Sequence, residues 1–146
     1  MQQMNNNNEP VYYAFVDGAA SGNPGDAGAG IVIYKNDEIF LTKSIYIGRT
    51  TNNVAEYMAL LKLLNTAKEN KIKKITIYTD SELLERQLSG MYKVKDRKLK
   101  KLHGEVMNYK KIMDFNVIHV GREKNKEADK LAKKACKMKS QEEYNV

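Results

Sequence analysis

Cysteine is nearly absent from this sequence, which contains a single residue of that type, Cys136. One cysteine cannot form a disulfide within the chain, so we expect a protein of a reducing compartment, the cytoplasm. No run of about 18 apolar residues occurs, which argues against a membrane-spanning helix. The start, MQQMNNNNEP, lacks the apolar core of a secretory signal. These absences predict a globular cytoplasmic protein with no membrane partner.

The basic charge is concentrated in one part of the chain. The formal net charge is +7, yet residues 1–85 contain eight Lys/Arg and ten Asp/Glu. Residues 86–113 contain nine Lys/Arg and two Asp/Glu, so most of the excess lies there. A local basic block beside an acidic remainder is typical of proteins that bind a polyanion such as nucleic acid. A solvated lysine-rich face is the alternative, and charge alone does not separate the two.

The length predicts one domain, with an irregular segment at each end. Residues 1–10 are rich in Asn and Gln and show no apolar periodicity, so we expect a disordered tail. Residues 139–146, KSQEEYNV, are expected to fray. The domain is therefore expected over residues 11–138, and we expect it to be a monomer.

Apolar spacing predicts an α/β fold with a mixed five-stranded sheet. Three strands come first, at 11–16 and in a hairpin over 29–47 that turns at the pair Asn36-Asp37. Strands at 73–80 and 115–120 then alternate with helices. The expected helices cover 52–70, 81–90, an amphipathic basic segment that ends near Met113, and 125–137. Three antiparallel strands followed by strand–helix alternation predict a mixed sheet flanked by helices.

Four acids occupy similar places in this pattern. Asp17 is expected to end the first strand and Asp80 the fourth, while Glu56 and Asp129 lie early in two helices. If the first and fourth strands are neighbours, the four side chains meet at one edge of the sheet. Carboxylates gathered in this way repel one another unless divalent cations offset the charge. Two such ions could activate water and stabilise the leaving oxygen of a phosphodiester.

Each acid also has an ordinary structural interpretation. Asp80 and the following serine could cap a helix, and Glu56 could complement a helix dipole. Asp129 could be an ordinary acid of a first turn, and Asp17 a turn residue. The spacing alone does not decide between these interpretations and a shared site.

The stretch DGAASGNPG, residues 17–25, raises the question of a phosphate-binding loop. A P-loop requires a lysine after its last glycine, and here Asp26 and Ala27 follow. A dinucleotide-binding loop leads into a helix, whereas this one leads into another predicted strand. The glycines therefore favour a tight turn between strands over a phosphate cradle.

Four short motifs stand in series: YAFVDGAASGNPGDAGAG, TTNNVAEYMAL, TIYTDS and HVGREKNKEADKLAKKA. Together they resemble the ribonuclease H family, of the type-one, bacterial-like kind, from about residue 11 to residue 138. The resemblance implies an endonuclease that cuts the RNA strand of an RNA–DNA hybrid with two Mg²⁺ ions, for which Mn²⁺ could substitute. It implies 5′-phosphate and 3′-hydroxyl ends, and it makes metal ligands of Asp17, Glu56, Asp80 and Asp129.

The resemblance also suggests two cationic residues of the active site. His119 falls where many relatives have a mobile histidine that is thought to help product release. Arg122 falls where some relatives use an arginine in a similar role. Because His119 lies between Ile118 and Val120, packing on the sheet is an equally open interpretation for it. We therefore favour Arg122.

Contacts with the substrate are implied for several asparagines and lysines. Asn23, Asn52 and Asn53 can donate and accept hydrogen bonds, which suits 2′-hydroxyl groups and base edges in a minor groove. Asn125 is a further candidate, either for substrate or for orienting the loop before Asp129, and a helix cap or loop residue is as good an interpretation. A substitute basic surface is expected from Lys93, Lys95, Arg97, Lys98, Lys100 and Lys101.

Two departures from the family pattern qualify the resemblance. Many relatives have a substrate-contacting glutamine after TDS, and Glu82 stands there instead. Many bacterial members insert a basic helix with tryptophan, but this chain has no tryptophan and only GMYKVKDRK in that place. The chain therefore resembles the short form without the protrusion. A nuclease for double-stranded RNA or DNA, or a catalytically silent binding module, remain the alternatives.

Overall fold

The computed structural model describes residues 9–138, which form a mixed five-stranded sheet. The strands lie side by side in the order β3-β2-β1-β4-β5. Their bounds are β1 Tyr12–Ala20, β2 Gly25–Lys35, β3 Glu38–Thr50, β4 Lys74–Thr79 and β5 Asp114–His119. β1 is central, with β2 antiparallel on one side and β4 parallel on the other. The predicted fold class, a meander followed by strand–helix alternation, is confirmed.

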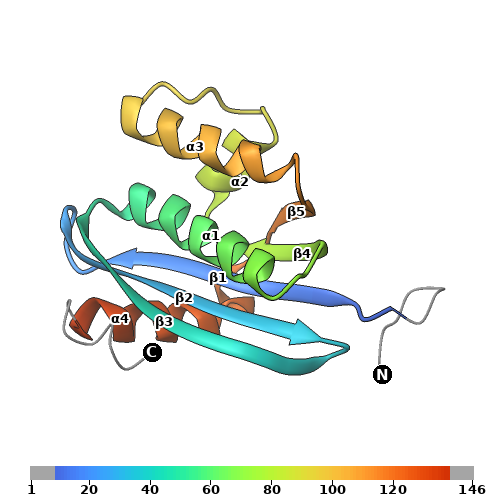
Figure 1. Ribbon diagram of the computed structural model, residues 1–146. Helices are drawn as coiled ribbons and strands as arrows, with labels where there is room; N and C mark the ends of the chain where they lie inside the picture. The colour runs from blue at the N-terminus through green and yellow to red at the C-terminus, as the bar shows by residue number, and fades with distance from the viewer. Residues whose placement is uncertain (1–8, 139–146) are drawn as a thin grey trace.

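Helices cover both faces of the sheet (Figure 1). One layer contains α1 (Asn52–Glu69), α2 (Glu82–Leu88) and α3 (Arg97–Tyr109), with α3 lying over α1. The opposite face carries α4 (Lys126–Met138), which follows a short 3₁₀ helix, η1 (Arg122–Lys124). The main core lies between α1 and the sheet and includes Ile31, Leu60, Leu63 and Ile77, each fully buried.

The first two strands are longer than predicted. β1 continues to Ala20, and β2 begins at Gly25. The strands extend this far because the Gly- and Ala-rich residues 18–20 and 27–29 pair in an antiparallel ladder. Asp17 therefore lies inside β1 and pairs with Gly30, so the expectation that it ends the strand was wrong. Such residues have weak strand propensity, and packing against helices on both faces overrides it. The turn at Asn36-Asp37 is confirmed, with φ of +50° and +67°.

The helix boundaries follow the capping signals of the sequence. Thr51 accepts a hydrogen bond from the Val54 N–H, and Ser81 accepts one from the Leu84 N–H. Gly90, with φ +85°, follows the end of α2 as predicted. The basic helix α3 is amphipathic, but it ends at Tyr109, so Met113 lies beyond it. Between Leu88 and Arg97 the chain forms only turns and irregular structure, which agrees with a short form lacking an inserted helix.

The predicted tails lie almost wholly outside the described residues. Residues 1–8 and 139–146 are not described, whereas Pro10, placed in the tail by the sequence, forms an isolated β-bridge. Across residues 9–138, none of the helices combines the length and the apolar character needed to cross a membrane.

Glycine lets two helices touch the sheet backbone. A Cβ added at Gly18 would lie 2.2 Å from the Ala55 carbonyl oxygen of α1. A Cβ added at Gly30 would lie 2.0 Å from the Ala128 carbonyl oxygen of α4. No side chain fits in those spaces, so small residues determine how closely α1 and α4 approach β1 and β2.

We predict that Gly30→Ala destabilises the protein by about 2–3 kcal/mol, because the new methyl group forces α4 away from the sheet. The matched control is Gly104→Ala on the exposed side of α3, where an added Cβ meets no atom within 4 Å. That change is expected to stabilise by about 0.5–1 kcal/mol, because alanine favours the helix. Chemical denaturation of both variants measures the effect, and equal stabilities would contradict the packing argument.

Candidate active site

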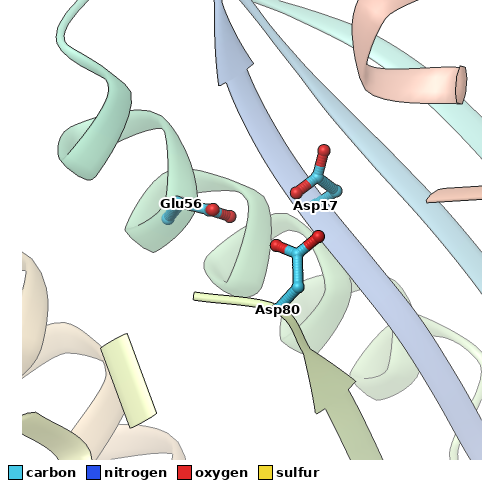
Figure 2. A group of neighbouring side chains, drawn as sticks. All are labelled: Asp17, Glu56 and Asp80. Atoms are coloured by element: carbon cyan, nitrogen blue, oxygen red, sulfur yellow. The ribbon is translucent and has the colours of Figure 1, made fainter. Parts of the chain in front are cut away.

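Three carboxylates converge at one end of the sheet (Figure 2). Asp17 comes from β1, Glu56 from α1, and Asp80 from the residue directly after β4. One oxygen of each lies within 4.8 Å of an oxygen of the other two. β1 and β4 are parallel neighbours, and their pairing runs to Val16 and Thr79, so the next residues of both strands emerge together. The predicted meeting of Asp17 and Asp80 is confirmed by this register.

Glu56 is held in place by the backbone of β1. Its Oε1 atom accepts a hydrogen bond of 2.8 Å from the Gly18 N–H. The bond forms because α1 rests directly on Gly18, where no side chain intervenes. Glu56 is 7% exposed, and its carboxylate points toward Asp17 and Asp80 (Figure 2). It is therefore a member of the carboxylate cluster, which an acid that only complements the helix dipole would not be.

Asp129 joins the cluster from the opposite helix layer. It lies in the first turn of α4 and lines the same cavity of about 600 Å³ as the three other acids. Its proximity raises the pKa of Asp17. Its Oδ2 atom also lies 3.0 Å from the Nζ atom of Lys133, one turn further along α4. The structure thus brings together all four acids identified in the sequence.

The ordinary interpretation of Asp80 as a helix cap does not hold. The Leu84 N–H at the start of α2 donates to the hydroxyl of Ser81, and the Asp80 carboxylate turns toward Asp17. Ser81 therefore caps α2, and the Asp80 carboxylate belongs to the carboxylate cluster.

Crowding and burial raise the proton affinity of the two innermost acids. Burial raises the pKa of Asp17, and the charges of Glu56, Asp80 and Asp129 raise it further. Burial also raises the pKa of Glu56, although the Gly18 N–H and the charge of Arg122 act in the opposite direction. Protons or cations are therefore needed to hold the cluster together near neutral pH.

The donor set fits a hard divalent cation. All candidate ligand atoms are carboxylate oxygens, which Mg²⁺, Ca²⁺ and Mn²⁺ prefer. The oxygens come from rigid elements, two strands and a helix, and already lie within 4.8 Å of one another. A bound dication would replace the protons that the raised pKa values imply.

Arg122 and His119 have different relations to the site. Arg122, at the start of η1, lines the cavity, and its charge favours the ionised form of Glu56. His119 is the last residue of β5 and is exposed, so its alternative interpretation as a packed strand residue is wrong. His119 is not among the residues that line the cavity.

The asparagines near β1 organise the edge of the cavity. The Asn23 Oδ1 atom accepts a hydrogen bond of 3.0 Å from the Asn52 N–H. The Asn52 Oδ1 atom in turn accepts from the Ala20 N–H at 3.2 Å, and Asn52 lines the cavity. Asn23, Asn52 and Asn53 are exposed. These three side chains therefore lie at the surface of the molecule.

Asn125 does not have the surface that a substrate contact requires. It is 1% exposed, and its Nδ2 atom donates to the Val16 carbonyl oxygen at 3.0 Å. We therefore correct its assignment from substrate binding to the alternative raised by the sequence: it fastens the loop before α4 to β1. This contact fixes the position at which α4, the helix that carries Asp129, begins.

The lysines of the basic segment lie away from the carboxylates. Lys93 and Lys95 are exposed on the connection between α2 and α3, on the α1 side of the sheet, and do not line the cavity. Glu82 is also exposed and lies 3.8 Å from Arg86. Three charged cavity residues were missed by the sequence analysis: Glu123, Lys126 and Lys133. For Lys133, the i, i+4 spacing from Asp129 was an available signal.

Comparisons with known proteins agree in family. The profile of the family described as reverse transcriptase-like matches residues 15–135. Ribonuclease HI of Halobacterium salinarum is 36% identical over 128 residues, which cover 84% of this chain and 63% of that protein. A bifunctional protein of Mycobacterium tuberculosis is 37% identical over 122 residues, covering 82% of this chain and 34% of its own length. The chain therefore spans less than two thirds of both relatives.

A solved structure extends the comparison to three dimensions. The crystal structure of LC11-RNase H1 in complex with an RNA/DNA hybrid matches with a TM-score of 0.82 and 38% sequence identity. The match covers 86% of this chain and 96% of that one.

We predict that Asp17→Asn stabilises the metal-free protein. Because the folded-state pKa of Asp17 is raised above its ordinary value of 3.8, the folded state holds its proton more tightly. The contribution of Asp17 to the free energy of unfolding is fully present below that ordinary pKa. It is lost progressively as the pH rises toward the raised pKa of the folded state. The variant does not lose this contribution. The difference in free energy of unfolding between Asp17→Asn and wild type should therefore grow from pH 5 to pH 8 and reach about 1–3 kcal/mol.

Denaturation in a chelating buffer at several pH values measures this effect. Asp114→Asn, at the exposed start of β5, is the matched control and should show no growing advantage. Added Mg²⁺ should stabilise the wild-type protein more than Asp17→Asn, because ligand binding favours the folded state. A variant that is less stable than wild type at pH 8 without metal would contradict the argument.

Proposed function

This chain belongs to the ribonuclease H family, and on that premise we propose that it hydrolyses the RNA strand of RNA–DNA hybrids. The observation that carries the proposal is the convergence of Asp17, Glu56, Asp80 and Asp129 in one cavity. A relative of the same fold binds an RNA/DNA hybrid, which supports the choice of substrate.

We propose that the four carboxylates hold two Mg²⁺ ions, with Mn²⁺ as an alternative. When bound, such ions supply an activated water and stabilise charge on the attacked phosphate. The raised pKa values of Asp17 and Glu56 support this assignment, because a cluster that resists ionisation alone gains most from added positive charge. Glu56 stays oriented through its bond to Gly18, and Asp129 through the α4 frame.

The reaction is hydrolysis of a phosphodiester. The water oxygen bonds to phosphorus, the bond from phosphorus to O3′ breaks, and O3′ leaves with a proton. The products carry 5′-phosphate and 3′-hydroxyl ends. Arg122 lies at the cavity wall, where a guanidinium can bind phosphate oxygens in the attacked or the released strand.

Binding of the duplex is assigned to groups around the cavity. The amide nitrogens of Asn23, Asn52 and Asn53 suit 2′-hydroxyl groups and base edges in the minor groove of a hybrid. The exposed lysines of the α2–α3 connection and α3 contribute phosphate contacts that weaken with salt. The enzyme is further proposed to act as a cytoplasmic monomer of the short, type-one form.

We predict that wild-type protein with Mg²⁺ cleaves a labelled hybrid, and that Asp80→Asn reduces the rate by roughly 100-fold or more. The loss follows because one carboxylate of the cluster no longer carries charge. Asp114→Asn makes the same chemical change on an exposed residue of β5 and should retain the wild-type rate. Gel analysis of the labelled RNA, with double-stranded RNA and DNA as parallel substrates, measures rate, ends and preference.

The proposal fails if the hybrid stays intact with Mg²⁺ and Mn²⁺, or if Asp80→Asn cleaves normally. Faster cleavage of double-stranded RNA or DNA than of the hybrid would assign a different duplex. Metal-independent binding without turnover would indicate a silent binding module.

Arg122→Ala is expected to reduce turnover about tenfold, because it removes the one guanidinium that lines the cavity among the described residues. His119→Ala should have a smaller effect, since the exposed histidine is not among the residues lining the cavity. Steady-state kinetics on the hybrid compare the two variants, with thermal unfolding as a check on the fold. A larger loss in His119→Ala would reverse the assignment and make the histidine the working cation.

A further inference from the structure

A second hollow lies beside the active-site cavity, on the α4 face of the sheet. Its volume is about 220 Å³. Its floor consists of Phe15, Val32 and Tyr34 from β1 and β2, and its wall is the segment 123–128, which contains the end of η1 and the start of α4. The hollow therefore lies at the N-terminal end of α4, beyond which the helix no longer covers the strands.

Its floor belongs to a group of four aromatic rings, Tyr13, Phe15, Tyr34 and Tyr78, which we call the aromatic group. Phe15 stacks on Tyr78 with ring centroids 5.0 Å apart, and Tyr13 stacks on Tyr34 at 4.8 Å. The pairs meet edge to face, with Phe15 and Tyr34 centroids 6.1 Å apart. All four are only partly buried. Rings held by neighbours in this way offer a preorganised surface for another planar group.

The wall of the hollow carries an unsatisfied acceptor. Asn125 is 1% exposed, and its Nδ2 atom is engaged by the Val16 carbonyl oxygen. Its Oδ1 atom is buried and has no hydrogen-bond partner among the described residues. Because this oxygen is buried, it belongs to the fixed wall of the hollow and lies out of reach of a ligand there. The first N–H groups of α4 lie on the same wall and have no acceptor within the helix.

The hollow is continuous with the catalytic machinery. Glu123 and Lys126 line both the hollow and the active-site cavity. Within β1, Phe15 stands two residues before Asp17, so both side chains lie on the same face of the sheet. A strand leaving the active site over this face meets the aromatic group next.

We propose that this hollow binds one unpaired nucleobase of a strand that extends beyond the hybrid. The inference rests on the proposed function, because it needs a nucleic acid at the adjacent site. A nucleobase offers a planar face that can stack on the ring of Phe15 or of Tyr34 at the floor of the hollow. Lys124 and Lys126 are exposed and can contact its phosphates, which would have to keep clear of Glu123 and Glu127 in the same wall.

Binding without turnover tests the proposal. In the Asp80→Asn background, dissociation constants are measured by fluorescence anisotropy for a blunt hybrid and for hybrids with four unpaired nucleotides. The overhang is placed in turn at the 5′ or 3′ end of the RNA or the DNA strand. At least one overhang should strengthen binding roughly five- to tenfold, as expected for a stacked base. The same overhang made of abasic residues should give no gain, because it keeps the phosphates and loses the bases.

Variants of Tyr34 assign the gain to the hollow. Tyr34→Leu keeps an apolar side chain but removes the ring face, so it should abolish the gain and leave affinity for the blunt hybrid unchanged. Tyr34→Phe keeps the ring and should retain the gain. Phe40→Ala removes an aromatic residue that is 38% exposed elsewhere on the sheet and should also retain it. Thermal unfolding of each variant verifies the fold.

Three results would overturn the inference: no overhang strengthens binding, the abasic overhang binds as well as the natural one, or Tyr34→Leu retains the full gain. Cleavage of the blunt hybrid by the protein with an intact Asp80 is scored separately. If the blunt hybrid is cleaved and overhangs do not change affinity, the inference that the hollow binds a base is wrong, while the proposed function stands. If blunt hybrid is neither bound nor cleaved, the proposed function fails first.

Discussion

Mutual repulsion among buried carboxylates is the constraint on which this structure depends. Asp17 and Glu56 are 4% and 7% exposed and face Asp80 and Asp129, whose charges make these two buried acids harder to ionise. Side chains on flexible loops would separate to relieve this repulsion. Here they are mounted on a central strand, a buried helix and the end of a parallel neighbour, which prevents that relief. The unfavourable arrangement persists because the surrounding core holds it, and a cation can then be bound where its charge is most needed.

The frame that resists the repulsion is built from backbone contacts. α1 approaches β1 until the Gly18 N–H reaches Glu56, and α4 rests on Gly30 through its own carbonyl group at Ala128. Asn125 adds a buried bond from the loop before α4 to Val16. Larger residues at the two glycines would shift the helices, and with them the acids that they carry. The stability of the packing and the geometry of the site are therefore set by the same contacts.

Positive charge and aromatic rings are unevenly distributed around this centre. Positive groups lie at the cavity wall, at Arg122 and Lys126, while the large basic excess lies on the α2–α3 connection and α3. Beside the cavity, the partly buried rings of Phe15 and Tyr34 form the floor of the hollow, and charged residues of the segment 123–128 form its wall. In the proposed complex, the reaction, the phosphate contacts and base stacking would fall to separate parts of the molecule.

The sequence by itself determined the elements, their order and the identity of the four acids. Apolar periodicity and capping residues such as Ser81 are local signals, and the acids stand in short motifs that can be read in order. It did not determine that β1 runs past Asp17, because Gly and Ala acquire strand structure only through packing on both faces. The burial of polar side chains could not be predicted from the sequence either. Asn125 and His119 are both polar, yet Asn125 is buried and His119 is exposed. Only the tertiary structure, through close contacts between segments far apart in the chain, decided which polar groups face the cavity.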